Sequence, residues 1–246
     1  MKKLILLLLF IPLVFSCSSE NDNEDDTTPD EKQSVPTNCA GEKIRTKVYG
    51  TQEWTLENAC NTTYRDGTTI PQVIDDSEWA NLTTGAWSYI DNNDPSKGKN
   101  YNWFAIAGIH DNDPSTPNKK FAPVGWHVPS ETEWQTLQDY LIENGHNYDG
   151  TNTGNKIAKS MASNVGWNLS NLAGTPGNDQ SINNKSEFNA KPDLNRFKDG
   201  KDMQGHIAIF WSSTEGIDFN IYFSAAKIVK HSNALQDGFF VRLIKD

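Results

Sequence analysis

Cysteine is scarce in this sequence, which has only three in 246 residues: Cys17, Cys39 and Cys60. A structural metal site built from cysteines needs further ligands at close spacing, so this scarcity excludes one. For Cys39 and Cys60 two alternatives stay open. In an oxidising compartment they would form a disulfide that closes a loop of about 20 residues and contributes roughly 3 kcal/mol. Otherwise they are two buried free thiols.

Basic residues are also few: 22 lysines and arginines stand against 32 aspartates and glutamates, which gives a net charge of −10. Part of this excess is local, because residues 18–37 hold seven acids and a single base. Binding to nucleic-acid phosphates requires clustered lysine and arginine side chains. We therefore expect no nucleic-acid partner.

The N-terminal apolar run, Leu4–Phe15, is shorter than the roughly 20 residues that a membrane-spanning helix needs. Two lysines precede it, and a short apolar run behind a basic start is typical of a signal peptide. The run ends in Ser16-Cys17, which resembles a bacterial lipobox. We predict a signal peptide over residues 1–16 and lipidation of Cys17, whose acyl chains would anchor the mature protein to a membrane.

The segment that follows, residues 17–37, is rich in acids, has no aromatic residue and contains Val35 as its one strongly apolar residue. Such a stretch buries too little surface to offset its ordering entropy, so we predict a disordered tether. Acids directly after a lipidated cysteine resemble an export signal of some Gram-negative lipoproteins. We therefore expect the protein on the outer membrane, facing the cell exterior.

The remaining residues, 38–246, are enough for one domain with a full core. Eight tryptophans and few aliphatic residues indicate a core that relies on aromatic side chains. The clearest helix follows Pro129, because Ser130 and Glu133 form the pattern of a capping box. Trp134, Leu137 and Leu141 then share one face.

Weaker patterns complete the domain. A strand over residues 43–49 is followed by a turn at 50–53 and a partner strand at 54–56. Asp75, Asp76 and Ser77 are the candidate caps of a short helix around 78–81. The further expectations are a buried strand at 101–109, a second short helix at 156–162, a long loop at 168–185, a strand region opening at 210–215, and final strands at 221–229 and 239–244. This order predicts an α+β fold with mostly antiparallel sheets, in which a terminal strand pairs with an early one.

Seven segments, in order, resemble the Fibrobacter succinogenes major paralogous domain over about residues 43–246. The most distinctive contains Gly-Trp-His-Val-Pro-Ser at 125–130, and the full set is 50–58, 63–68, 79–86, 101–105, 123–134, 210–215 and 238–246. The resemblance implies a C-type lectin-like fold, similar to that of formylglycine-generating enzymes, in cell-surface or secreted proteins of undefined activity. Cys60 and Leu243 depart from the family pattern, so the disulfide question is specific to this chain.

The sequence favours a protein that is not an enzyme. A formylglycine-type oxidase needs a late cysteine pair, and no cysteine follows Cys60. A hydrolase with a Ser-His-acid arrangement is a further hypothesis, drawn from Ser212 or Ser213 with His206 and Glu215. The Gly-x-Ser-x-Gly elbow that would support it is lacking. His127 is closer to a hydrogen-bonded core residue than to a proton shuttle. An enzyme with an unrecognised site stays an alternative.

We expect no cofactor, with calcium as an alternative. Asp111 and Asp113 lie in an oxygen-rich loop of the kind calcium favours. The loop lacks EF-hand spacing, and Asp-Asn-Asp before proline is also ordinary turn chemistry. The long loop after residue 168 lacks the Glu-Pro-Asn-type tripeptide of calcium-dependent lectins.

Trp87 and Tyr89 lie near an Asn/Asp-rich turn, where an exposed indole could stack on a sugar. Their alternative role is core packing. The function we expect is that of a non-catalytic binding or adhesion module, most plausibly for a glycan. The alternative is an interaction protein that docks another envelope protein.

Overall fold

The computed structural model describes residues 35–91, 97–199 and 204–246. The predicted signal peptide, lipidated Cys17 and most of the tether lie outside these residues. Within the described end of the tether, the carbonyl oxygen of Pro36 accepts a hydrogen bond from Ile44 N. No helix in the described part of the chain is long and apolar enough to cross a membrane.

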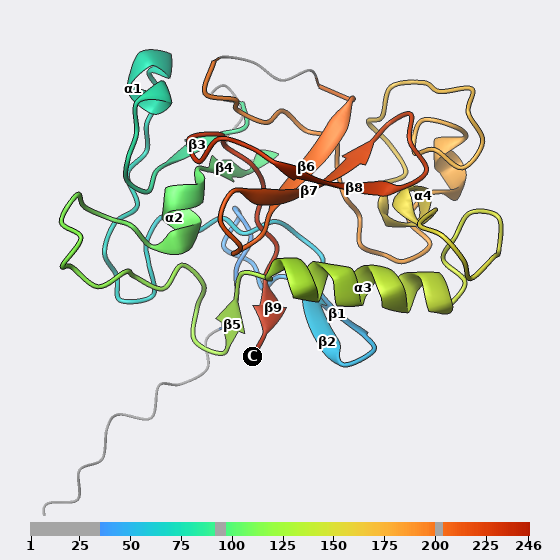
Figure 1. The fold of residues 1–246 in the computed structure, drawn as a ribbon, viewed down its shortest axis with the longest axis horizontal. Helices are drawn as coiled ribbons and strands as arrows, with labels where there is room; N and C mark the ends of the chain where they lie inside the picture. The colour runs from blue at the N-terminus through green and yellow to red at the C-terminus, as the bar shows by residue number, and fades with distance from the viewer. Residues whose placement is uncertain (1–34, 92–96, 200–203) are drawn as a thin grey trace, which may run out of the picture. The chain divides into compact units, whose positions relative to one another are not determined.

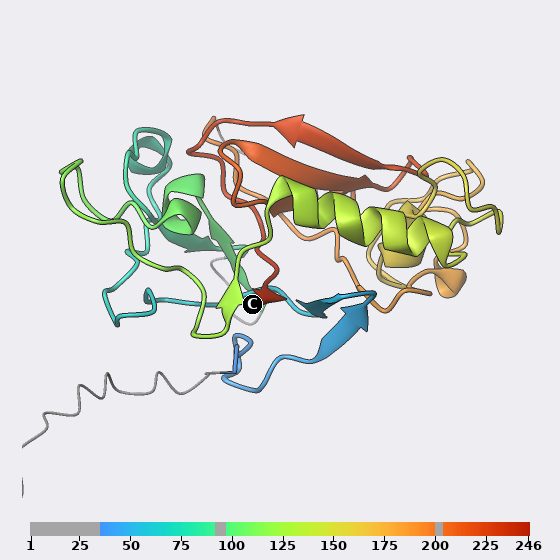
Figure 2. The same cartoon turned by 60° about the horizontal axis from the view of Figure 1, so that its bottom comes forward.

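The first sheet joins the two ends of the domain. Its strands are β1 (Thr46–Tyr49), β2 (Gln52–Thr55), β9 (Ile244–Lys245) and β5 (Trp126–His127), in the order β1-β2-β9-β5. The predicted pairing of a terminal strand with an early one is confirmed, and Figures 1 and 2 both place the blue hairpin beside the red C-terminal strand.

The turn of that hairpin is shorter than the sequence suggested. Strand β2 already begins at Gln52, opposite Tyr49, so only Gly50 and Thr51 form the turn. Gly50 has a φ of 64°, a backbone conformation that glycine adopts without steric cost. A two-residue connection between paired strands commonly needs such a residue.

The helix α3 (Glu131–Glu143) confirms the capping box, with both reciprocal hydrogen bonds between Ser130 and Glu133 present. Its buried face carries the predicted Trp134, Leu137 and Leu141. Helix α1 (Asp76–Ala80) likewise begins after Asp75, whose carboxylate accepts from Glu78 N. These local capping signals placed both helices correctly.

The strand expected over residues 101–109 is wrong. Strand β4 (Lys99–Tyr101) pairs with β3 (Trp87–Tyr89) and then stops, and helix α2 (Trp103–Ala107) follows. The side chain of Asn102 caps the helix by accepting from Ala105 N, and Gly108 ends it in the left-handed conformation. The capping residues therefore outweigh the apolar character of the run.

The third sheet has the order β6-β7-β8, from β6 (Ile207–Trp211), β7 (Ile217–Tyr222) and β8 (Ile228–Ser232). The strand expected over 221–229 is wrong, because a turn separates β7 from β8 in that range. Residues 239–244 make mostly isolated bridges, and only the end joins β9. The second predicted helix is present as α4 (Ala158–Met161).

The expected loop at 168–185 is irregular except for the one-turn 3-10 helix η2 (Gln180–Ile182). The core relies on aromatic side chains, as predicted. Trp134 stacks on Phe219 with ring centres 5.0 Å apart, and Trp54 meets Trp134 edge-on at 4.9 Å. The α+β class is confirmed, whereas the C-type lectin-like label stays a prediction.

Candidate functional site

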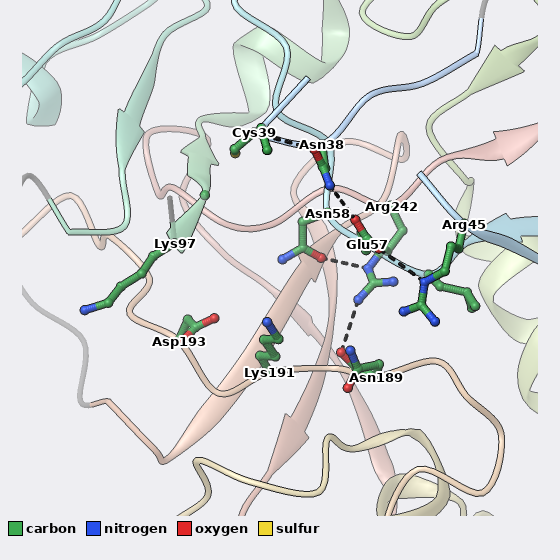
Figure 3. A pocket seen from close by; sticks show the side chains of 13 residues that line it. Asn38, Cys39, Arg45, Glu57, Asn58, Lys97, Asn189, Lys191, Asp193 and Arg242 are labelled. Atoms are coloured by element: carbon green, nitrogen blue, oxygen red, sulfur yellow. Dashed lines mark hydrogen bonds and ion pairs between the residues drawn. The ribbon is translucent and has the colours of Figure 1, made fainter. Parts of the chain in front are cut away.

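Two cavities of similar size serve as the candidate sites, the first with a mainly polar lining and the second with polar and apolar groups together. The disulfide pocket, of about 370 Å³, lies beside Cys39 and is lined by residues that include Asn58, Asn189 and Arg242 (Figure 3). The loop pocket, of about 380 Å³, lies under the long loop and is lined by residues that include Tyr148 and Lys159. Both volumes fall in the lower range of small-molecule sites.

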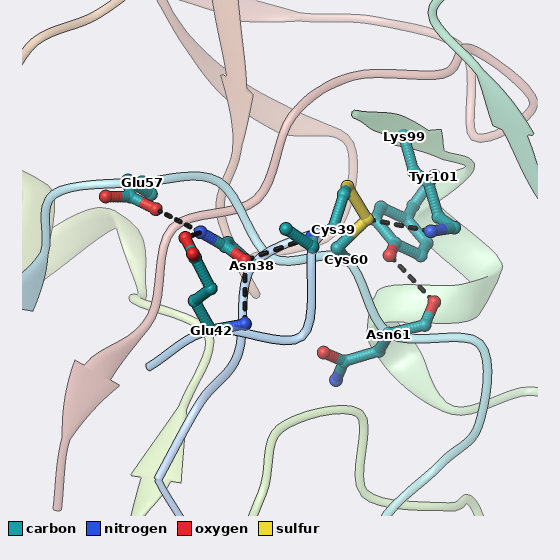
Figure 4. The surroundings of a disulfide bond; sticks show 9 residues. Asn38, Cys39, Glu42, Glu57, Cys60, Asn61, Lys99 and Tyr101 are labelled. Carbon is teal, nitrogen blue, oxygen red and sulfur yellow. Dashed lines mark hydrogen bonds between the residues drawn. A yellow bond between two sulfur atoms is a disulfide. The ribbon is translucent and has the colours of Figure 1, made fainter. Parts of the chain in front are cut away.

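Cys39 and Cys60 are joined in a disulfide, with Cα atoms 5.1 Å apart, which is one of the two alternatives that the sequence left open. The bond ties the segment before β1 to the loop after β2. Figure 4 shows Lys99 beside it, with its ammonium nitrogen 2.7 Å from Cys60 Sγ. Burial lowers the pKa of Lys99.

Trp87 and Tyr89 do not form an exposed sugar platform. Trp87 is only 6 % exposed, and its indole N–H donates to the Ile70 carbonyl at 2.9 Å. The two rings meet edge-on, and the Lys99 ammonium lies 4.9 Å from the centre of the first and 5.4 Å from that of the second. The pair therefore holds an internal cation, because Lys99 is the strand partner of Tyr89.

Asp111 and Asp113 shape their own loop. Asp111 Oδ1 accepts from Asp113 N at 3.0 Å, and Asp113 Oδ1 accepts from the backbone N and the hydroxyl of Ser115. These bonds lower the pKa of Asp113. Across the described ranges no three His, Cys, Asp or Glu side chains gather as a metal site. The loop is accounted for by turn chemistry.

Ser212, Ser213 and His206, the residues of the hydrolase hypothesis, do not form a catalytic arrangement. The Ser212 hydroxyl donates to the Ile217 carbonyl at 2.8 Å and is fully buried. The ring of His206 instead packs edge-on against Phe223. In the described part of the chain, no hydrogen bond links His206 to either serine.

His127 is a hydrogen-bonded structural residue. Its Nδ1 lies 2.7 Å from Asp246 Oδ1 and its Nε2 lies 2.8 Å from Glu133 Oε1, so it links the capping box to the chain end. Burial lowers the pKa of His127, but the bonds to these two carboxylates outweigh burial and raise it above 6.5.

The loop pocket presents Tyr148, which is 46 % exposed. Gly174 has a φ of 78°, and a Cβ built there would lie 2.2 Å from the tyrosine ring. The ring therefore packs directly on the bare backbone of Gly174. This contact restricts the ring, which also lines the loop pocket.

Lys159, from α4, anchors the loop above the pocket. It is 5 % exposed, and its ammonium donates to the carbonyls of Thr175, Asn178 and Asp179 and to the Asn183 side chain. Burial lowers the pKa of Lys159, and the nearby Asp179 offsets part of this. Three N–H donors thus meet four oxygen acceptors, which fully satisfies the cation.

Asparagine side chains also hold the long loop in place through hydrogen bonds. Asn183 Nδ2 donates to the carbonyls of Ser163 and Pro176, and Asn164 Nδ2 donates to three carbonyls at residues 180, 181 and 183. The abundance of asparagine in this stretch was the available sequence signal. It indicated a loop, and it did not reveal that the amides of the buried Asn183 and the exposed Asn164 hold the loop in place.

His146 and Ser160 also line the loop pocket, with Nδ1 and Oγ 2.9 Å apart. Burial, together with the charges of Lys185 and Lys47, lowers the pKa of His146, so the imidazole is neutral at neutral pH. No carboxylate of the described residues forms a hydrogen bond with His146. The pair therefore lacks the third, orienting group of a catalytic triad.

Comparison with known proteins places the chain in a family. Residues 48–245 match the Fibrobacter succinogenes major domain, so the chain belongs to this family. The resemblance read from the sequence is confirmed. No curated protein matches the chain. No solved structure matches it either.

Proposed function

We propose that this protein is a lipid-anchored, non-catalytic binding module on the outer membrane, facing the cell exterior, that takes a carbohydrate in its loop pocket. The observation that carries the proposal is Tyr148, a partly exposed aromatic ring that packs on a glycine backbone and lines a cavity with both polar and apolar groups. Sugar C–H groups stack on such rings, and a fixed ring loses little entropy on binding.

The polar groups around Tyr148 suit hydroxyl ligands. Asn178 and Lys185 line the same cavity and carry hydrogen-bonding groups, and the neutral His146 ring can either donate or accept. The loop that holds these groups is fastened through Lys159. A pocket that is ordered in advance avoids part of the cost of binding.

The experiment is binding of the full chain to a panel of neutral oligosaccharides by calorimetry, with and without a chelator. Tyr148→Ala should weaken binding at least about tenfold. Leu169→Ala is the matched control, since Leu169 is 87 % exposed and lies outside the pocket lining. Absence of binding to any neutral glycan, or full binding by Tyr148→Ala, would refute the proposal, and loss on chelation would reveal a cation requirement.

A second candidate function, docking of an envelope protein, is favoured by the apolar side chains near the loop pocket. Val165, Leu169, Leu172 and Ile182 are each more than half exposed, all within the same stretch of chain. Grouped exposed apolar residues are typical of interaction sites. Cross-linking in outer-membrane extract should recover one stoichiometric partner, and Leu172→Asp should abolish its capture while leaving glycan binding intact.

A further inference from the structure

The disulfide pocket contains a buried arginine without a carboxylate partner. Arg242 is 2 % exposed, and its guanidinium carbon lies 4.7 Å from the Phe188 ring centre and 5.5 Å from that of Phe210. Among the described residues, no carboxylate forms an ion pair with it. Burying a charge is costly unless an opposite charge or hydrogen bonds compensate for it.

The hydrogen bonds of Arg242 satisfy only part of its donors. Nε donates to Asn58 Oδ1 at 2.7 Å, Nη1 to the Thr55 carbonyl at 3.0 Å and Nη2 to the Asn189 carbonyl at 3.4 Å. A guanidinium has five N–H groups, so two have no acceptor in the described part of the protein. All three acceptors are neutral oxygens. No carboxylate is therefore hydrogen-bonded to Arg242, although the charge of Glu57 in the same pocket acts on it at longer range.

The rest of the lining is also rich in cations. Arg45 lies on one side of Arg242, and Lys97, Lys191 and Asp193 lie on the other (Figure 3). With Glu57, the pocket contains four cations against two carboxylates, in a chain whose net charge is −10. Arg45 is 3.4 Å from Glu57, and Lys97 is 2.9 Å from Asp91. With Asp91 counted, four cations stand against three carboxylates, so the local excess is a single positive charge, opposite in sign to the charge of the whole protein.

We propose that the disulfide pocket binds a carboxylate-bearing sugar of the uronate class, with Arg242 donating hydrogen bonds to the carboxylate and Asn58 and Asn189 contributing to contacts with the sugar hydroxyls. Arginine is suited to this role because its planar fork can meet both oxygens of a carboxylate. The cavity of about 370 Å³ accommodates a single sugar ring. This site is separate from the loop pocket and does not depend on it.

A bound carboxylate would supply the hydrogen-bonded counter-charge that Arg242 lacks in the folded protein. Binding should therefore stabilise the fold as well as retain the sugar, because a ligand that binds only the folded state raises the unfolding temperature. Burial lowers the pKa of Arg242 to about 9, which leaves the guanidinium charged at neutral pH. A neutral sugar cannot provide this compensation.

The test titrates the full chain with D-glucuronate and with neutral D-glucose at low salt, by calorimetry and by thermal unfolding. Glucuronate should bind at least about tenfold more tightly than glucose, raise the unfolding temperature and lose affinity as salt is added. Equal affinity for the two sugars, or no binding of glucuronate, would overturn the inference. A carboxylate-bearing dipeptide that bound more tightly than glucuronate would overturn its sugar part.

Variants locate the site. Arg242→Lys keeps a cation but loses the fork, and should reduce glucuronate affinity at least about tenfold. Because Arg242 is buried and its variant can fail to fold, Lys191→Ala provides the exposed alternative, with an expected loss of about threefold. The control is Lys227→Ala, an exposed lysine outside the pocket, which should bind normally. Unchanged affinity in folded Arg242→Lys or in Lys191→Ala would place the sugar elsewhere.

The outcome is independent of the loop pocket. Tyr148→Ala should leave glucuronate binding intact, whereas Lys191→Ala should leave neutral oligosaccharide binding intact. Failure of the neutral glycans alone would refute the proposed function and not this site. Loss of glucuronate binding in Tyr148→Ala would refute the separate site.

Discussion

The loop pocket and the disulfide pocket each contain a buried cation held by neutral oxygens, and they differ in whether the donors are satisfied. Lys159 offers three N–H groups to four acceptors from one stretch of the chain. Arg242 offers five N–H groups to three acceptors from distant segments. A satisfied cation is a structural anchor, whereas a partly satisfied cation beside a cavity has capacity for a ligand.

The largest expected effect is on the structural anchor. Lys159→Met keeps the apolar stem but removes the ammonium, which leaves buried loop carbonyls without a donor. We expect the free energy of unfolding to fall by about 3 kcal/mol and neutral glycan binding to be lost. Chemical denaturation measures the first effect, and calorimetry the second.

Lys156→Met is the matched control, because Lys156 lies three residues away in a partly exposed ion pair with Asp149. Such a pair contributes less than about 1 kcal/mol. Equal losses in the two variants would contradict the anchoring role of Lys159 and would break the comparison between the two buried cations.

The next effect concerns the disulfide. Replacing Cys39 and Cys60 together by serine removes a constraint across 21 residues and should lower the free energy of unfolding by roughly 3 kcal/mol. The segment that carries Cys39 lines the disulfide pocket, so glucuronate affinity should fall as well. Neutral glycan binding should persist. An equal loss at both pockets would show that they are not independent.

Tyr148→Ala tests the loop pocket in the same way that the cysteine variant tests the disulfide pocket. Since the ring is partly exposed, its removal should cost less than about 1 kcal/mol of stability while reducing neutral glycan affinity at least about tenfold. Tyr148→Phe should retain most of the affinity if stacking dominates. A large loss in the phenylalanine variant, measured in the same titrations, would instead assign the affinity to the hydroxyl group.

The smallest effect is a pH dependence confined to the disulfide pocket. Burial raises the pKa of Asp193 above 3.8, and Lys191 and Lys97 offset part of that rise. Protonated Asp193 therefore adds to the free energy of unfolding. This contribution is fully present below pH 3.8 and is lost as the pH rises through the pKa of Asp193 in the folded protein. A bound carboxylate repels the Asp193 carboxylate, so glucuronate affinity should increase a few-fold as pH falls through the same pKa.

Asp193→Asn should remove this pH dependence and bind glucuronate more tightly at neutral pH. Titrations between about pH 7 and about pH 4.5, with the sugar carboxylate ionised, measure both variants. A pH profile that is unchanged in Asp193→Asn would assign the titration to another group.

Sequence reasoning succeeded where the signal is local. Ser130 and Glu133 predicted the start of α3, since a cap and its helix are neighbours in the chain. For α1 the sequence offered three candidate caps, of which Asp75 is the one used. It failed at residues 101–109, where the capping role of Asn102 was overlooked in an apolar run. It also left Trp87 ambiguous, because burial depends on partners such as Ile70 and Lys99.

The sequence by itself determined the family, the α+β class and the aromatic core, because these follow from segment order, capping patterns and composition. Only the tertiary structure decided which cations are satisfied. The acceptors of Arg242 come from residues 53 to 187 positions away, so its spare donors cannot be counted before the chain is folded. Local hydrogen bonds can be predicted because their partners are neighbours in the sequence. The balance of buried donors and acceptors cannot, because long-range packing sets it.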